Sequence, residues 1–396
     1  MKNIHIGNSM LLGESDRHGE LLQSNLTPLQ PLVFLCGARD FHAMDWHKSA
    51  KELSPDKEIY ILTDLIAGEG FKKIINDSDK VFKLIIIDKF LFKKQSGFGN
   101  IWRNFIKLLV FPIQIFLIRK FSHKYPRAIY HAHSMYYLFL AWAAGICYVG
   151  TPQGSDILIK PFKSWFYRCF AIKSLAAAKA ITVDSDRMKE KVFELTGLDA
   201  HVIQNGIDLE AISTFLNHSK NHSANRDILL SIRALTPLYR IKDIVKARNS
   251  SIKLSNIALT FIYPFYENEY KKEVVSLFKP IDKDLGRMER IEMYKLLSSS
   301  KLVFSIPYSD SSPRSVYEAI FCGCAVGITH NSYYDVLPQC MKSRIVVVDL
   351  HDKDWLEIAI EKSNKIISKQ YYPSDEALIL FDQKKSFRKM EELLFS

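Results

Sequence analysis

The sequence lacks the marks of several protein classes. None of its six cysteines pairs with another in a Cys-x-x-Cys motif, so we expect reduced, mostly buried thiols of a cytoplasmic protein. No apolar run approaches the roughly 20 residues of a membrane span. Residues 1–20 have no sustained apolar core, which argues against a signal peptide. We identify no Asp-x-Asp pair at a plausible metal site, and we expect no metal and no other cofactor.

The composition indicates an ordered, globular chain. With 396 residues, 47% hydrophobic and 24% charged, the chain suits two domains of about 150–200 residues each. Its net charge of +11 calls for an anionic partner, which could be nucleic acid, a phosphorylated ligand or a membrane surface. Because no nucleic-acid-binding motif is recognisable, we expect no nucleic-acid partner.

Apolar runs of strand length alternate with helix-like segments along the chain. The strands expected in the first half are Pro31–Gly37, Glu58–Thr63, Val81–Ile87, Ala128–His133, Ile146–Thr151 and Ala180–Asp184. The second half repeats the alternation from Asp227–Ile232 onward, and a last helix is expected at 376–394. This rhythm predicts an α/β fold with right-handed crossovers, parallel sheets and ligands at the carboxyl ends of the strands.

Composition changes divide the chain into four parts. The first residues carry little pattern, and the polar stretch 218–226 (HSKNHSANR) makes a credible linker. We therefore predict an N-terminal extension at 1–30, a first domain at 31–212, a second domain at 226–372 and a C-terminal helix at 373–396.

One stretch, 301–330 (KLVFSIPYSDSSPRSVYEAIFCGCAVGITH), reads as strand, polar loop, helix, glycine turn and strand. Ser309–Ser312 supply N-cap side chains, and Pro313 suits the first helical turn. A helix that begins directly after a parallel strand offers free amides and a positive dipole to a ligand. Asp310 and Glu318, eight positions apart, can approach two parts of one extended ligand. From the residues alone, an anion site and an ordinary turn between a strand and a helix both remain open.

This spacing of an acid, seven residues and a Glu within an "EA…G" helix resembles the retaining glycosyltransferases of the GT-B fold. More narrowly, it resembles the large family that builds bacterial polysaccharides from nucleotide sugars, glycosyl transferases group 1. The resemblance implies two Rossmann-like, doubly wound domains facing across a cleft. It also implies that Glu318 binds the nucleotide ribose and Asp310 the hydroxyls of the transferred sugar. The loop that holds the sugar and phosphates corresponds to Ser311, Ser312, Arg314 and Ser315.

Further positions in the second half match the same family. Arg233, at a strand end, resembles the family's diphosphate-binding Arg, although a surface salt bridge is the plainer interpretation. The family's Lys a few residues later is missing, and Arg240 and Lys242 are the two alternatives for its charge. The segment 284–300 resembles the one that meets the nucleobase, with Arg287 and Met288 as candidates.

Matches in the first half concern the acceptor. The stretch 150–157 (GTPQGSDI) resembles the family's loop that faces both substrates, which nominates Gly154, Ser155 and Asp156. Many relatives have a His where this chain has Gln153. His42 lies in a segment that resembles the entry loop of some relatives, although packing is the commoner role for such a His. The sequence QNGID (204–208) resembles the crossover between the domains.

The segment 90–127 holds eight Lys or Arg and no Asp or Glu, with aromatic and aliphatic residues between them. We expect its apolar part, Phe105–Ile118, to be too short for a membrane span and to be interrupted by Pro112. One interpretation is a basic amphipathic helix lying on an anionic membrane surface. The other is a crossover helix packed on the sheet with solvated lysines.

The resemblance therefore implies a retaining, metal-independent hexosyltransferase. It would move a sugar from a nucleoside-diphosphate sugar to a glycan acceptor, which we expect to be lipid-linked, in the synthesis of cell-surface polysaccharide such as lipopolysaccharide. We expect it to be cytoplasmic and peripheral on the inner face of the cell membrane. The alternatives are a GT-B nucleotide-sugar epimerase and a non-catalytic, membrane-associated subunit that binds nucleotide sugars.

Overall fold

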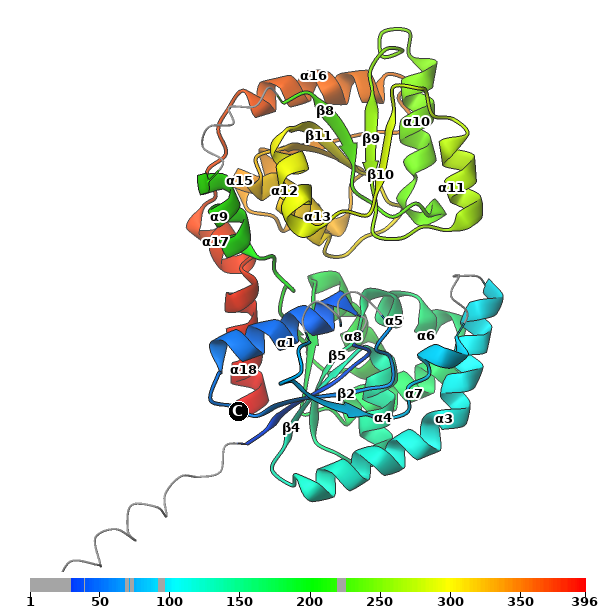
Figure 1. Ribbon diagram of the computed structural model, residues 1–396, viewed down its shortest axis with the longest axis vertical. Coiled ribbons are helices and arrows are strands. Elements are labelled where there is room, and N and C mark those ends of the chain that lie inside the picture. The colour runs from blue at the N-terminus through cyan, green and yellow to red at the C-terminus, as the bar shows by residue number, and fades with distance from the viewer. Residues whose placement is uncertain (1–29, 39, 68–70, 72–74, 92–96, 219–225) are drawn as a thin grey trace, which may run out of the picture.

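The computed structural model describes residues 30–396 apart from 39, 68–70, 72–74, 92–96 and 219–225. All but the last residue of the predicted extension 1–30 lies outside the described residues. Two parallel sheets stand one above the other along the long axis of the molecule, each covered by helices (Figure 1). The α/β fold with two Rossmann-like domains is therefore confirmed.

The first sheet has the strand order β3-β2-β1-β4-β5-β6-β7. Its strands are β1 (Leu32–Leu35), β2 (Ile59–Thr63), β3 (Lys80–Lys83), β4 (Ile129–His133), β5 (Tyr148–Thr151), β6 (Ala180–Val183) and β7 (His201–Val202). The helices between them are α1 (Phe41–Leu53), α3 (Gly97–Lys124), α4 (Met135–Ala144), α5 (Gly154–Leu158), α6 (Lys160–Lys163), α7 (Trp165–Ala176) and α8 (Asp186–Thr196).

The second sheet has the order β10-β9-β8-β11-β12-β13. Its strands are β8 (Ile228–Ser231), β9 (Leu259–Ile262), β10 (Lys283–Gly286), β11 (Ser300–Ser305), β12 (Ala325–Ile328) and β13 (Ile345–Val347). The larger helices that follow them are α10 (Ile241–Ser250), α11 (Asn268–Val275), α12 (Arg290–Ser298), α13 (Arg314–Phe321) and α16 (Trp355–Ile367).

Both faces of each sheet are buried, which explains why the strands are continuous apolar runs. In β1, Val33 and Leu35 pack into one core and Leu32 and Phe34 into another. Successive side chains of a strand point to opposite faces, and a parallel sheet with helices on both sides buries both of them. The central strands therefore position the loops at their carboxyl ends rigidly.

The chain crosses between the domains twice, and the two crossings touch. Ile207 N donates to Phe381 O at 2.7 Å, and Gln383 N donates to Ile207 O at 3.1 Å. Gly206 has φ +65, and a Cβ there would lie 2.6 Å from the Gln383 backbone. Glycine adopts this positive φ at little cost and has no Cβ to clash with the backbone of Gln383. This explains why the crossover contains an Asn-Gly pair.

Several predicted boundaries were wrong. The last helix is two, α17 (Asp375–Leu380) and α18 (Gln383–Phe395), because Asp382 caps a new helix by accepting from the amides of Lys384 and Lys385. After this break, α18 packs its apolar side onto the first domain, against the β1 face that holds Phe34. The third strand, β3, ends at Lys83 rather than at the predicted Ile87.

The segment 90–127 also differs from its prediction. Pro112 lies inside α3 without ending it, and the helix runs the full length Gly97–Lys124. Among the described helices, Ile101–Lys124 is the one long and apolar enough to cross a membrane, with 11% of its apolar window buried. Length and composition alone give this result, and it corrects the expectation that the segment is too short.

Candidate active site

A cavity of about 790 Å³ lies between the two domains. Its walls come from loops at the carboxyl ends of β4, β5 and β6 in the first domain and of β8, β9, β10 and β11 in the second. A cavity of this size is large enough for a drug-sized ligand. Of the predicted site residues, those that line it are His42, Gly154, Ser155, Arg233, Arg287, Met288, Asp310, Ser311, Ser312, Arg314, Ser315 and Glu318.

The N-terminus of α13 opens into this cavity. Pro313 is its N-cap residue rather than its first helical residue, and among the described residues no side chain caps this end. The predicted capping by Ser309–Ser312 was therefore wrong. Ser312 instead donates its hydroxyl to Gln204 Oε1 at 2.7 Å. Within the first turn, Val316 N already donates to Pro313 O at 2.9 Å, which leaves the amides of Arg314 and Ser315 for an anionic ligand.

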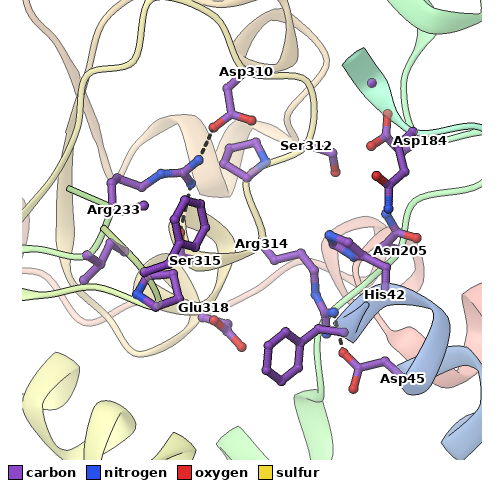
Figure 2. A pocket seen from close by; sticks show the side chains of 18 of the residues that line it. His42, Asp45, Asp184, Asn205, Arg233, Asp310, Ser312, Arg314, Ser315 and Glu318 are labelled. Carbon is purple, nitrogen blue, oxygen red and sulfur yellow. Dashed lines mark hydrogen bonds and ion pairs between the residues drawn. The ribbon is translucent and has the colours of Figure 1, made fainter. Parts of the chain in front are cut away.

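Arg233 and Asp310, predicted to bind different parts of one ligand, bind each other here. Arg233 Nη2 lies 2.6 Å from Asp310 Oδ2, and Arg233 Nη1 donates to Ser315 Oγ at 3.0 Å (Figure 2). The guanidinium also lies over the Tyr239 ring, 4.5 Å from its centroid. Burial lowers the pKa of Arg233, but the charge of Asp310 and the contact with Tyr239 together outweigh it and leave the pKa raised. The arginine is therefore a fixed, permanent cation at the cavity wall.

Glu318 lies one turn into α13, with its carboxyl at the cavity wall and only 6% of its surface exposed. Burial raises its pKa, and the charges of Arg290 and Arg314 oppose that shift. Tyr294 Oη lies 3.5 Å from Glu318 Oε1. A carboxylate with so few protein donors can accept hydrogen bonds from ligand hydroxyls.

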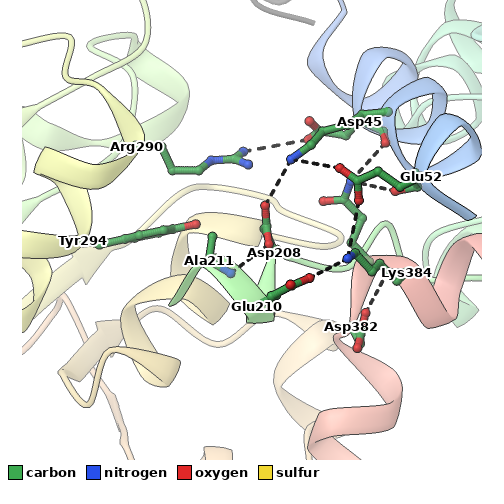
Figure 3. Close-up of polar contacts among 12 residues, drawn as sticks. Asp45, Glu52, Asp208, Glu210, Ala211, Arg290, Tyr294, Asp382 and Lys384 are labelled. Atoms are coloured by element: carbon green, nitrogen blue, oxygen red, sulfur yellow. Dashed lines mark hydrogen bonds and ion pairs between the residues drawn. The ribbon is translucent and has the colours of Figure 1, made fainter. Parts of the chain in front are cut away.

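Arg314 reaches across the cavity to the first domain. Its Nη1 lies 2.5 Å from Asp45 Oδ2, and its Nη2 donates to Gln383 Oε1 at 3.2 Å (Figure 2). Arg290 is a second, weaker partner of Asp45, at 3.9 Å (Figure 3). Arg314 therefore joins the two domains in addition to lining the cavity.

Three predicted residues lie elsewhere in the described structure. Arg240 pairs with Asp243 at 2.9 Å, Lys242 pairs with Glu273 at 2.6 Å, and neither lines the described cavity. Asp156, in the first turn of α5, is buried and accepts a hydrogen bond from the amide of Met135 at 3.0 Å. It also completes a capping box with Gln153. Asp156 therefore holds the loop in shape, a role that its spacing from Gln153 could have indicated.

Gln153 and His133, which line the first-domain wall, both contact Asp40, a residue that the sequence analysis did not nominate. Asp40 receives a hydrogen bond from Gln153 Nε2 and lies 3.5 Å from His133 Nδ1. Although burial opposes it, the contact with His133 lowers the pKa of Asp40 to about 2. Burial lowers the pKa of His42 to about 4, so this imidazole is neutral at pH 7.

Asp184 is the other missed residue, and it belongs to an Asp-x-Asp pair with Asp186. Asp184 lines the cavity, whereas Asp186 is exposed in the first turn of α8. Across the described ranges, no group of three or more His, Cys, Asp or Glu side chains is arranged to hold a metal ion. The available signal for Asp184 was its place directly after a strand, at the edge where ligands bind.

Comparisons with known proteins agree with this architecture. Residues 96–211 match the model of Glycosyltransferase Family 4. No curated protein matches the chain significantly. HepE of Anabaena, solved with UDP and glucose, superposes with a TM-score of 0.65 at 14% identity, covering 92% of this chain and 99% of that one.

Two other solved structures are similar. Sucrose-phosphate synthase of Thermosynechococcus elongatus has a TM-score of 0.69 at 12% identity, over 92% of this chain and 98% of that one. An enzyme of Listeria monocytogenes described as a putative UDP-N-acetylglucosamine 2-epimerase has a TM-score of 0.54 at 12% identity, over 92% and 95%. The resemblance noted in the sequence is thereby confirmed: the chain has the GT-B fold, and within its first domain it matches Glycosyltransferase Family 4.

Proposed function

We propose that this protein is a retaining glycosyltransferase that uses a nucleoside-diphosphate sugar and needs no metal. The observation that carries the proposal is the convergence of Arg233, Glu318 and the uncapped end of α13 on one cavity between two domains. A fixed cation and free amides suit a diphosphate, and an acceptor carboxylate suits a ribose. HepE, which shares the fold, was solved with UDP and glucose.

Each residue then has its own role in binding the substrates of the transfer. Glu318 binds the ribose, Arg233 and the amides of α13 bind the diphosphate, and Asp310 exchanges Arg233 for hydroxyls of the donor sugar. Arg287 and Met288, on the loop before α12, contact the base. The acceptor oxygen bonds to the anomeric carbon on the face from which the diphosphate leaves, and the departing phosphate oxygen takes the acceptor proton. Positioning and stabilisation of the leaving charge supply the rate enhancement.

We propose further that the acceptor is a lipid-linked glycan of polysaccharide synthesis and that α3 lies on the inner membrane surface. One side of α3 packs toward the first domain through Gln114, Ile118 and Phe121. The opposite side carries exposed apolar side chains at helical spacing. We call these the α3 stripe: Ile101, Phe105, Leu108, Leu109, Ile113 and Phe116. Figure 1 shows α3 along the outer edge of the first domain, running from the top of that domain to its base.

A second exposed cluster belongs to the same domain and supports the same partner. Trp165 and Phe166, at the start of α7, are 70% and 72% exposed. We call the Trp165 patch the cluster of Ile159, Phe162, Trp165, Phe166 and Phe170. Residues 157–183 contain five Lys or Arg and no acid. Aromatic and aliphatic side chains among cations favour an anionic bilayer surface, where each cation adds about 1 kcal/mol.

Two alternatives to the transferase remain compatible with this fold. The similarity to the Listeria protein keeps the epimerase alternative, and the pairing of Asp310 with Arg233 suits a subunit that binds without turnover. A thermal-shift screen of nucleotide sugars tests binding first, since a donor at 100 times its dissociation constant stabilises by about 2.7 kcal/mol. Release of nucleoside diphosphate that depends on an added acceptor then supports transfer. Interconversion of the free nucleotide sugar would support the epimerase, and binding without release the subunit.

A further inference from the structure

Asp184 stands where the two walls of the cavity meet. It follows β6 directly, in the first domain, and lines the cavity together with Ser311 and Asp310 of the second. The walls are close here, because a Cβ on Gly154 would lie 3.3 Å from Ser311 Oγ. Figure 2 shows Asp184 on the side of the cavity opposite Arg233 and Glu318.

The carboxyl group of Asp184 is only partly paired within the protein. Its Oδ1 is buried and, within the part of the chain that the structure describes, has no hydrogen-bond partner. Burial raises its pKa to about 6; the charge of Asp310 adds to the shift, and the hydroxyls of Ser185 and Ser311 oppose it. Buried polar groups are paired in the great majority of cases, and an unpaired one calls for an explanation. The unpaired Oδ1 itself holds no described element in place.

A second unsatisfied group lies on the same wall. His42 Nδ1 is also buried without a hydrogen-bond partner among the described residues, and His42 lines the same cavity. The sheet order β1-β4-β5-β6 places the loops after these strands side by side. The wall thus presents a carboxylate and a neutral imidazole, which together match the hydroxyl groups of a sugar.

We propose that Asp184 is a specificity-determining residue that accepts a hydrogen bond from a hydroxyl group of the acceptor sugar, beside the donor sugar. This inference rests on the proposed transferase function. The acceptor is assigned because Asp184 belongs to the first domain, whereas Arg233, Glu318 and α13, which suit the donor, all belong to the second.

The test separates donor binding from acceptor use. Asp184→Asn keeps the shape and removes the charge, and Asp186→Asn is the matched control two residues away on the surface. Donor affinity is measured by calorimetry with UDP-glucose, or with the nucleotide sugar that stabilises the protein most. Transfer is measured to octyl glucoside, octyl galactoside and octyl mannoside.

We expect Asp184→Asn to bind the donor within twofold of the unmodified protein. Its kcat/KM for the acceptor should fall about 10–100-fold, as expected for loss of one hydrogen bond to a charged group. Glu318→Gln should instead lose donor binding, and Asp186→Asn should change neither quantity.

Two results would overturn the assignment: unchanged kcat/KM for the acceptor, or donor binding weakened as much as in Glu318→Gln. If the unmodified protein binds a nucleotide sugar but transfers to none of the glycosides, Asp184 is not an acceptor residue for sugars of this kind. If it binds no nucleotide sugar, the proposed function itself fails, which is a different and recognisable outcome.

Discussion

Arg314 and Asp45 join the two domains through an ion pair of 2.5 Å at the edge of the cavity. Both side chains are largely buried, at 12% and 7% exposure. Each comes from a helix that bears on the cavity, α13 and α1. The pair is therefore placed to couple the state of the site to the relative position of the domains.

The first prediction concerns this pair. A double-mutant cycle of Arg314→Gln and Asp45→Asn, measured by denaturant unfolding, should give a coupling of about 1–3 kcal/mol. Removal of one partner alone should cost more than removal of both, because it leaves a buried charge uncompensated. Additive single and double variants would contradict a direct interaction. The same cycle on Lys272 and Glu269, an exposed pair at 3.4 Å, is the control and should show little coupling.

The same pair should depend on pH. Burial opposes ionisation of Asp45, but Arg314 outweighs it and lowers the pKa of Asp45 below 3.8. A lowered pKa means that the folded protein binds this proton less readily than the unfolded one. The stabilisation is therefore present above about pH 4 and is lost as the pH falls through the folded value. The coupling measured at pH 7 should shrink at pH 3, and a coupling independent of pH would contradict the ionised pair.

The second prediction concerns Glu318. Glu318→Ala should abolish transfer and reduce donor affinity at least 100-fold without unfolding the protein, since burial already disfavours its charge. Donor binding is measured by calorimetry and folding by circular dichroism. Glu292→Ala, on the outside of α12, serves as the control. Full activity in the Glu318 variant would remove the basis of the assignment.

The third prediction concerns the effect of Asp184 on the stability of the protein. Its pKa is raised, so the folded protein binds the proton more readily than the unfolded chain, and its ionisation costs stability as the pH rises to about 6. A shift of this size corresponds to about 3 kcal/mol at most. Asp184→Asn should therefore raise the thermal midpoint at pH 8 and leave it nearly unchanged at pH 4. A lowered midpoint at pH 8 would show that the carboxylate is structural.

The fourth prediction concerns the membrane. Leu108→Glu and Trp165→Glu should each reduce binding to vesicles of phosphatidylglycerol and phosphatidylcholine at least tenfold in a flotation assay. Ile252→Glu changes an apolar residue of the second domain that is even more exposed, at 92%, and should have no effect. Transfer to a soluble octyl glycoside should persist in all three variants.

Two outcomes would contradict this surface. Binding that is equal with vesicles of phosphatidylcholine alone would remove the role of the lysines and arginines. A dimer that dissociates in the Leu108 and Trp165 variants, with no vesicle binding in the unmodified protein, would identify the apolar side chains as a contact between copies.

Much of the architecture follows from local signals in the sequence. Buried parallel strands are short apolar runs, so β1 and β11 can be predicted from their composition alone. The spacing of Asp310 and Glu318 predicts that both lie near the N-terminus of one helix. The side chains of Arg240 and Lys242 were not predictable in this way. Arg240 has φ +56 and turns toward Asp243, and such a local reversal leaves no mark in residue spacing.

Contacts between distant segments explain the remaining gaps. Asp45 is an ordinary helix residue until α13 brings Arg314 against it, 269 positions away in the chain. From the sequence, Asp184 is only the residue at the end of a strand. Its place in the cavity wall depends on the second domain, which supplies the opposite wall. The break between α17 and α18 depends on Phe381 and Gln383 meeting the crossover at Ile207. In each case the decisive neighbour lies in the other domain or in the other crossing.

The salt bridge between Arg233 and Asp310 also affects which molecules can bind at this wall of the cavity. Each of the two charges already has its counterion. Inorganic phosphate that binds Arg233 leaves the carboxylate of Asp310 unpaired. A simple sugar that binds Asp310 likewise leaves the guanidinium of Arg233 unpaired. Only a molecule that carries an anion and a polyol at the right separation replaces both at once. Under the proposed function, the ion pair therefore favours binding of an intact nucleotide sugar over binding of either of its parts.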